Sequence, residues 1–263
     1  GMLFKIAAVP FHFWAPDVYE GSPALTTALM STLAKVVAIA TLFKLVSGLN
    51  LISSLENQDL LHTFEVIVVV LSIASMSVGN IMALRQVNVK RMLAFSGISH
   101  AGFMLMTFLT IATSAGVLLY YTAAYALAGI ASFAVIIYVT RNKDNEATAN
   151  FNGLGKTNPL LAAVLTASLL SMAGIPIFSG FFAKFMLFSD AIKAGYLFLV
   201  IVGVINSIIS VGYYFKLILA MYTKEASAEK PAVPAVYYLV AVSAIVLNIA
   251  IGLYPSLVSH LLN

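Results

Sequence analysis

The sequence has 263 residues, of which 61% are hydrophobic and only 9% are charged, and its formal net charge is +4. Soluble domains carry about 25% charged residues, so this composition excludes a soluble enzyme, a disordered region and a nucleic-acid-binding protein. The lack of cysteine excludes a disulfide framework, a thiolate metal site and a thiol nucleophile. The composition therefore predicts an integral membrane protein.

Residues 1–23 are predicted to be the end of a broken transmembrane helix, followed by a loop on the cytoplasmic side. Gly1 to Val9 is apolar but too short to cross a hydrocarbon core of about 30 Å. The segment is fully hydrophobic from its first residue, so we expect the chain to be truncated at its N-terminus. Lys5 lies within it, and Pro10 ends it because proline lacks a backbone donor and clashes with the preceding turn.

Seven membrane-spanning segments follow, the fifth of them broken. Each is mainly apolar and reaches the length of about 20 residues that a helix needs to cross the bilayer. We predict them at Ala24–Leu45, Phe64–Leu84, Met92–Thr113, Gly116–Thr140, Pro159–Ile192, Tyr196–Tyr222 and Val233–Tyr254. The fifth would be about 51 Å long as one helix, and Gly174 and Pro176 are expected to interrupt it. The predicted fold class is an all-α, polytopic transmembrane helical bundle.

The basic residues of the loops indicate an orientation. Eight of the 14 lie in three alternate loops, where we expect them to be solvated: Arg85, Lys90, Arg91, Arg141, Lys143, Lys156, Lys224 and Lys230. The opposite loops hold only Lys193 and, between Gly48 and His62, the acidic Glu56 and Asp59. Since Lys and Arg accumulate in cytoplasmic loops, the three basic loops are predicted to face the cytoplasm and the C-terminus the periplasmic side.

Three lysines lie inside predicted spans: Lys35, Lys44 and Lys216. Lys44 and Lys216 are close enough to a helix end to extend their ammonium groups to the interface. Lys35 is about 16 Å from either end of its span, whereas a lysine side chain reaches about 6 Å. We therefore expect Lys35 to face the protein interior or a file of water molecules.

His100 lies at mid-span and shares a polar stripe with Ser96 and Thr107. The next span offers a second polar stripe, which includes Tyr121 and Tyr125. Ionisable residues inside spans are functional candidates because burying them is costly. A packed, hydrogen-bonded histidine and a structural tyrosine network are the alternatives to a proton path.

Two further lysines lie beside predicted helix breaks: Lys5 precedes Pro10, and Lys184 follows Pro176 by two turns. Broken helices at membrane depth mark ion sites in transporters, although a plain packing kink is the alternative. A lysine passes a proton on only if burial or a neighbouring cation favours its neutral form. Joined by water molecules, Lys5, Lys35, His100 and Lys184 would form a lateral proton wire.

Three segments resemble a known family. They are Lys5 to Gly21 (KIAAVPFHFWAPDVYEG), Lys90 to Gly102 (KRMLAFSGISHAG) and Ala173 to Phe185 (AGIPIFSGFFAKF). Together they resemble the N-type subunits of proton-pumping NADH:quinone oxidoreductase, respiratory complex I. The related L and M subunits and Mrp-type sodium/proton antiporter subunits share the general pattern, but they usually lack the form Asp17-Val18-Tyr19.

The resemblance implies an antiporter-like subunit of fourteen helices, built from two inverted repeats of five helices that each contain a broken helix. This chain would be its second half. Lys5 and Lys184 match the lysines on the two broken helices, Lys35 matches the connecting lysine, and His100 matches a histidine of the central hydrophilic axis. The helix breaks would lie at Pro10, Gly174 and Pro176.

The resemblance also implies a function. The subunit would translocate protons through the Lys, His and water wire while electrons pass from NADH to quinone in other subunits. FMN, iron–sulfur clusters and quinone would belong to those subunits, and this chain would bind no cofactor or metal. Its partners would be the other membrane subunits of complex I and the lipid bilayer of a bacterial inner membrane, and it would bind no nucleic acid. The alternatives are an Mrp-type cation/proton antiporter subunit and a purely structural scaffold.

Overall fold

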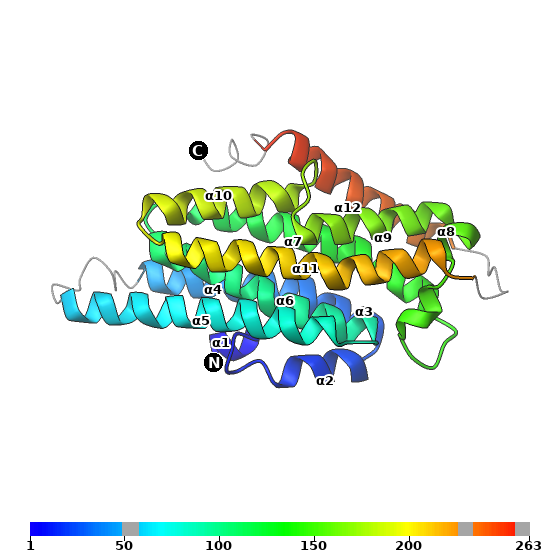
Figure 1. Cartoon of the computed structure of the whole chain (residues 1–263), viewed down its shortest axis with the longest axis horizontal. Coiled ribbons are helices and arrows are strands. Elements are labelled where there is room, and N and C mark those ends of the chain that lie inside the picture. The colour runs from blue at the N-terminus through cyan, green and yellow to red at the C-terminus, as the bar shows by residue number, and fades with distance from the viewer. Residues whose placement is uncertain (49–57, 226–233, 256–263) are drawn as a thin grey trace.

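The computed structural model describes residues 1–48, 58–225 and 234–255, and this part of the chain is helical without any extended strand (Figure 1). The elements are α1 (Met2–Lys5), α2 (Trp14–Gly21), α3 (Ala24–Leu29), η1 (Met30–Ala34), α4 (Lys35–Gly48), α5 (Gln58–Leu84), α6 (Val89–Leu105), η2 (Met106–Thr110), α7 (Ala115–Thr140), η3 (Thr148–Phe151), α8 (Leu154–Thr157), α9 (Pro159–Ala173), α10 (Ser179–Lys193), α11 (Leu197–Thr223) and α12 (Ala235–Leu253). The predicted all-α helical bundle is thereby confirmed.

Six helical stretches in the described residues are long and apolar enough to cross a membrane. They are Ala24–Gly48, Asp59–Leu84, Val89–Thr110, Ala115–Thr140, Leu197–Thr223 and Ala235–Leu253. The long helices run along the long axis of the molecule (Figure 1). Helix α5 begins at Gln58, six residues before the expected Phe64. Three residues used in the predictions, Glu56, Lys230 and Val233, lie outside the described residues.

Helix α6 forms the centre of the bundle, and most of its residues are buried. Helix α5 packs against it through glycines: a Cβ atom on Gly79 would lie 2.6 Å from the backbone nitrogen of Ser99, and one on Gly102 would lie 2.8 Å from that of Met76. Small residues of this kind let transmembrane helices approach closely. The two helices therefore hold one another in a single register.

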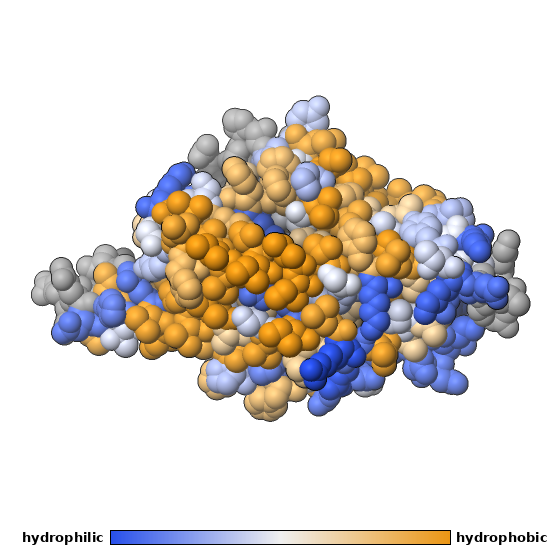
Figure 2. Space-filling view, in the orientation of Figure 1, coloured by the Kyte–Doolittle hydropathy of each residue, from blue (hydrophilic) through white to orange (hydrophobic). Residues whose placement is uncertain are grey.

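Hydrophobic residues cover most of the middle of the face seen in Figure 2, and hydrophilic residues gather towards the end that carries α8. Large apolar side chains on α11 and α12, such as Phe198, Ile208 and Leu239, are exposed. An apolar band between polar ends is the surface that a lipid bilayer requires.

Two basic residues that were predicted in the loop before α6 lie in its first turn, where they are paired and not simply solvated. Lys90 is buried, forms an ion pair with Glu146 at 2.8 Å and donates a hydrogen bond to the carbonyl of Ser22 at 2.7 Å. The prediction that the charges of this loop are solvated is wrong for Lys90, because the α7–α8 loop and the end of α2 close over it. Arg91 pairs with Asp17 and Glu20 and so ties α2 to the start of α6.

Candidate functional site

The break between α9 and α10 is built by a glycine-ended helix. Gly174 has a left-handed backbone (φ 89°), and its N–H and that of Ile175 bond back to the carbonyls of Leu170 and Ser171. This arrangement is a Schellman-type C-cap. Ile177 also has a positive φ of 86°, which is strained for a β-branched residue. The chain restarts as α10 at Ser179, so the break lies midway along the bundle (Figure 1).

Lys184 satisfies the two carbonyls of α9 that the cap leaves free. Its Nζ donates to the carbonyl of Met172 at 3.1 Å and to that of Ala173 at 2.9 Å, and the side chain is buried. The last four carbonyls of a helix have no partner within the helix, and a cation there is favoured by the helix dipole. The ammonium group also lies 4.9 Å from the ring centroid of Phe103. A Cβ atom at Gly174 would lie 3.0 Å from Cδ of Lys184, so the glycine leaves room for the lysine.

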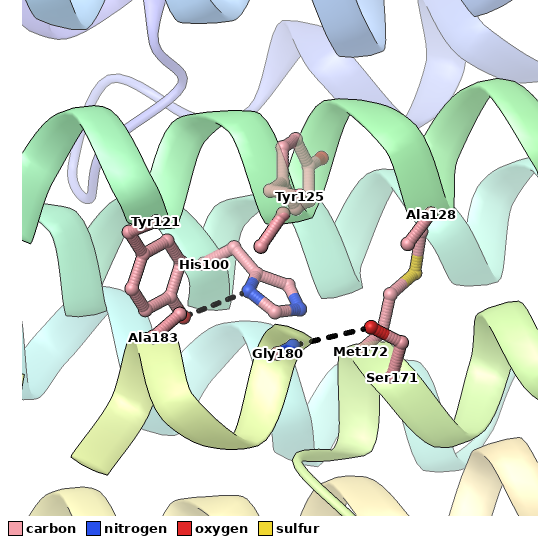
Figure 3. Close-up of a pocket in the computed structure, with 9 residues that line it drawn as sticks. His100, Tyr121, Tyr125, Ala128, Ser171, Met172, Gly180 and Ala183 are labelled. Carbon is pink, nitrogen blue, oxygen red and sulfur yellow. Dashed lines mark hydrogen bonds between the residues drawn. The ribbon is translucent and has the colours of Figure 1, made fainter. Parts of the chain in front are cut away.

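His100 lies next to this break, on α6. Its Nδ1 is 2.9 Å from the hydroxyl oxygen of Tyr121, and its ring centroid is 4.9 Å from that of Tyr125. A cavity beside the imidazole is lined by His100, Tyr121, Ala124, Tyr125, Ala128, Ser171, Met172, Gly180 and Ala183 (Figure 3). The volume of the cavity that the centre of a water molecule can occupy is about 10 Å³. One buried water molecule needs about this volume. The cavity therefore suits a single water molecule with polar partners.

Lys35 reaches the same region from the other side. It is 2% exposed and directly follows the π-helical turn η1, a local irregularity that often accompanies functional sites. Its Nζ lies 6.0 Å from the ring centroid of Tyr125. A Cβ atom on Gly97 would lie 2.6 Å from this Nζ. The absence of a side chain at Gly97 thus makes room for the ammonium group against α6.

The structure therefore brings three of the four predicted titratable residues together. Along α6, His100 lies between Gly97, which borders the ammonium group of Lys35, and Phe103, whose ring borders that of Lys184. Lys5 is different: it is exposed, at the end of the single turn α1. The single turn α1 packs against α4 and against Trp14 of α2, and the described residues leave the Lys5 side chain exposed.

The first break has its own stabilising contacts. Pro10 is exposed, and Ala7 has a positive φ of 59°. The N–H of Val9 donates to the hydroxyl of Ser75 at 3.0 Å, and the indole of Trp14 donates to the carbonyl of Phe4 at 2.9 Å. Two backbone groups at this break thus bond to side chains other than Lys5.

Lys44 and Lys216 are exposed, as expected for side chains near helix ends, and Lys216 donates to the carbonyl of Gln86 at 3.4 Å. Outside the spans, burial raises the pKa of Tyr19, with a smaller contribution from Tyr125. The described residues contain no group of three or more His, Asp or Glu side chains that could hold a metal ion.

Sequence reasoning missed a second buried polar group, made of Asn80, Asn206, Tyr213 and Tyr214. These residues join α5 and α11 to Ser96 on α6 through hydrogen bonds. The sequence carried a signal for this group, namely an asparagine inside each of two apolar spans. Burying an asparagine in a membrane costs free energy unless its amide has a hydrogen-bonding partner.

Comparison with known proteins places this geometry in context. The family described as NADH:quinone oxidoreductase/Mrp antiporter, TM, matches residues 1–210. NADH-quinone oxidoreductase subunit N of Flavobacterium johnsoniae is 79% identical over 263 residues, which are 100% of this chain and 57% of the relative. Subunit N of Cytophaga hutchinsonii is 44% identical over 257 residues, 97% of this chain and 54% of the relative. The chain thus spans about half the length of the curated relatives it matches.

Chains of two solved membrane complexes also resemble this chain in structure. A chain of respiratory complex I from Thermus thermophilus with bound aureothin is 34% identical and has a TM-score of 0.84, covering 98% of this chain and 56% of that one. A chain of the Mrp complex from Dietzia sp. has a TM-score of 0.85 at 22% identity, covering 97% of this chain and 55% of that one. The second likeness shows a shared fold.

Proposed function

Because this chain belongs to the NADH:quinone oxidoreductase/Mrp antiporter family of transmembrane subunits, we propose that it is part of subunit N of a proton-pumping NADH:quinone oxidoreductase. In this proposal the chain moves protons, while electron transfer from NADH to quinone takes place in other subunits. FMN, iron–sulfur clusters and quinone belong to those subunits. The family and the six apolar helices make the chain an integral membrane protein.

One observation carries the proposal: Lys35, His100 and Lys184 are all buried, and His100 lines a cavity of the size of one water molecule. Burial disfavours the charged form of a lysine, so each ammonium group can release its proton to a neighbour. His100 lies between the two lysines and is hydrogen-bonded to Tyr121, which orients the imidazole. A water molecule in the cavity beside the imidazole completes a path from Lys35 through His100 to Lys184.

Lys184 has a distinct place in this path. Two backbone carbonyls at the end of α9 hold its ammonium group. They stabilise the protonated lysine, and loss of the proton leaves the end of the half-helix without a cap. Proton release at Lys184 and the backbone of the break are therefore coupled. Lys5, with Pro10, joins the path at the first break when the rest of the subunit is present.

The partners in this proposal are the other membrane subunits of complex I and the lipid of a bacterial inner membrane. The basic loops face the cytoplasm and the C-terminus faces the periplasm, in line with the bias of Lys and Arg. An Mrp-type cation/proton antiporter is the alternative. The 34% identity to a chain of complex I and the 22% identity to a chain of an Mrp complex favour the first reading.

A pair of lysines from the same helix tests the proposal. Lys35→Ala in the full-length subunit, assembled in its complex, is expected to lower proton pumping several-fold, because it removes a buried proton carrier. Lys44→Ala on the same helix is expected to pump normally, because that side chain is exposed. Pumping is measured as quenching of a pH-sensitive dye in membrane vesicles. Equal losses for the two variants would contradict the proposal.

A further inference from the structure

A chain of hydroxyl and amide groups runs from α6 to the lipid-facing helices α5 and α11. Its members are all buried and come from positions far apart in the sequence: Ser96, Tyr214, Tyr213, Asn80 and Asn206. The hydroxyls of Ser96 and Tyr214 are hydrogen-bonded. The rings of Tyr214 and Tyr213 are in contact, with centroids 4.4 Å apart, and their hydroxyls are paired. The hydroxyl of Tyr213 lies 3.0 Å from Oδ1 of Asn80. The proton path through His100 uses none of these groups.

The direction of every hydrogen bond in this chain follows from its outer end. The amide nitrogen of Asn80 lies 3.0 Å from the backbone carbonyl oxygen of Asn206 and 3.1 Å from its Oδ1. A backbone carbonyl only accepts, so the group that faces it has to be the amide nitrogen and not the oxygen. Asn206 is held in turn, because its own amide donates to the carbonyl of Val202 at 3.0 Å. Oδ1 of Asn80 is therefore fixed towards Tyr213.

The direction of each remaining hydrogen bond follows from the direction of the one before it. Since Oδ1 of Asn80 only accepts, the hydroxyl of Tyr213 donates to it. A hydroxyl has one proton to donate, so Tyr213 accepts from Tyr214, and Tyr214 accepts from Ser96. All three hydroxyl dipoles point away from α6, and their oxygen ends face the centre of the bundle.

That centre is where Lys35 and His100 lie. Ser96 is one turn before His100 on α6 and adjacent to Gly97, whose Cα borders the ammonium group of Lys35. Among the described residues, no ion pair involves Lys35, His100 or Lys184. Buried positive charge needs a partner, and carbonyls serve Lys184 in that role.

We propose that Ser96, Tyr214, Tyr213 and Asn80 are positioning residues that act as a dipolar counter-charge for the proton held by Lys35 and His100. Asn80 sets the direction of the chain, and the hydroxyls transmit it to α6. The amide at the outer end has no basic site for a proton, so the chain stabilises charge without carrying it away towards the lipid. This inference rests on the proposed proton-translocating function.

Several titratable groups face the same centre, and a test has to leave all of them unchanged except the one that it substitutes. They come from α2, α4, α6, α7, α10 and α11: Tyr19, Lys35, His100, Tyr121, Tyr125, Lys184, Tyr213 and Tyr214. Tyr213→Phe removes only one hydroxyl and leaves the aromatic ring in place. The variant therefore interrupts the dipole chain with the smallest change to packing.

The test is the pH dependence of proton pumping by the assembled complex that carries Tyr213→Phe. Without the dipole chain, the protonated centre is less stable and loses its proton at lower pH. The alkaline decline in pumping is expected to move about half a pH unit towards acid. The matched control is Tyr120→Phe, which removes a buried hydroxyl that donates only to the backbone carbonyl of Ile251 at 2.7 Å. Its profile is expected to coincide with that of the unmodified complex.

Asn80→Leu supplies a second measurement, and it replaces Tyr213→Phe if the tyrosine variant does not assemble. The alkaline decline in pumping is expected to shift as far for Asn80→Leu as for Tyr213→Phe. The variant that carries both substitutions is expected to shift no further, because both interrupt the same chain of hydrogen bonds. A Tyr213→Phe profile that coincides with the Tyr120→Phe profile would overturn the inference. Normal pumping by Lys184→Ala would instead contradict the proposed function, so the two failures are distinguishable.

Discussion

Lys184→Ala is expected to lower proton pumping, and the quinone reductase activity coupled to it, by about tenfold or more in the assembled complex. The change removes a buried proton carrier and leaves the carbonyls of Met172 and Ala173 without a donor. Pumping and NADH:quinone reductase activity are measured in the same membrane vesicles. The matched control is Lys193→Ala, on the same helix, where the side chain is exposed at the helix end.

A second substitution separates the two roles of Lys184. Lys184→Arg keeps a positive charge and donors for the two carbonyls, but a guanidinium does not release its proton. The arginine variant is therefore expected to assemble and yet not to pump. If the arginine variant pumps normally, the lysine only caps α9 and carries no proton.

Gly180→Ala is expected to lower the amount and the thermal stability of the assembled complex more than other single-methyl changes in this chain. A Cβ atom at Gly180 would lie 1.9 Å from the carbonyl oxygen of Ser171, where α9 and α10 meet. Backbone at this crossing has to move, and overpacking costs about 1–3 kcal/mol even where only side chains shift. Both residues also line the cavity beside His100.

The control is Gly48→Ala, because no atom of the described residues lies within 4 Å of a Cβ added at Gly48. The amount of assembled complex is measured by native gel electrophoresis, and its stability by thermal unfolding in detergent. Equal amounts and equal melting temperatures for the two variants would contradict the close approach of α9 and α10.

Much of the fold could be predicted, because its signals are local. Apolar runs of bilayer length appear as the six long helices, and Gly174 with Pro176 marks the break between α9 and α10. The placement of Lys35 in the interior also follows from length alone, since its side chain is shorter than its distance from the interface. Lys90 escaped this reasoning because its partner Glu146 lies on another loop.

The membrane-spanning helices, the interruption at Gly174 and Pro176 and the burial of Lys35 follow from the amino-acid sequence, because hydropathy, chain length and backbone restriction act within one segment. Which buried groups meet depends on the packing of the helices. Lys184 reaches back to the end of α9, Gly97 makes room for Lys35, and Asn80 bonds Asn206 across 126 positions of sequence. Such contacts depend on which helices are neighbours and at what depth, and packing between helices sets both.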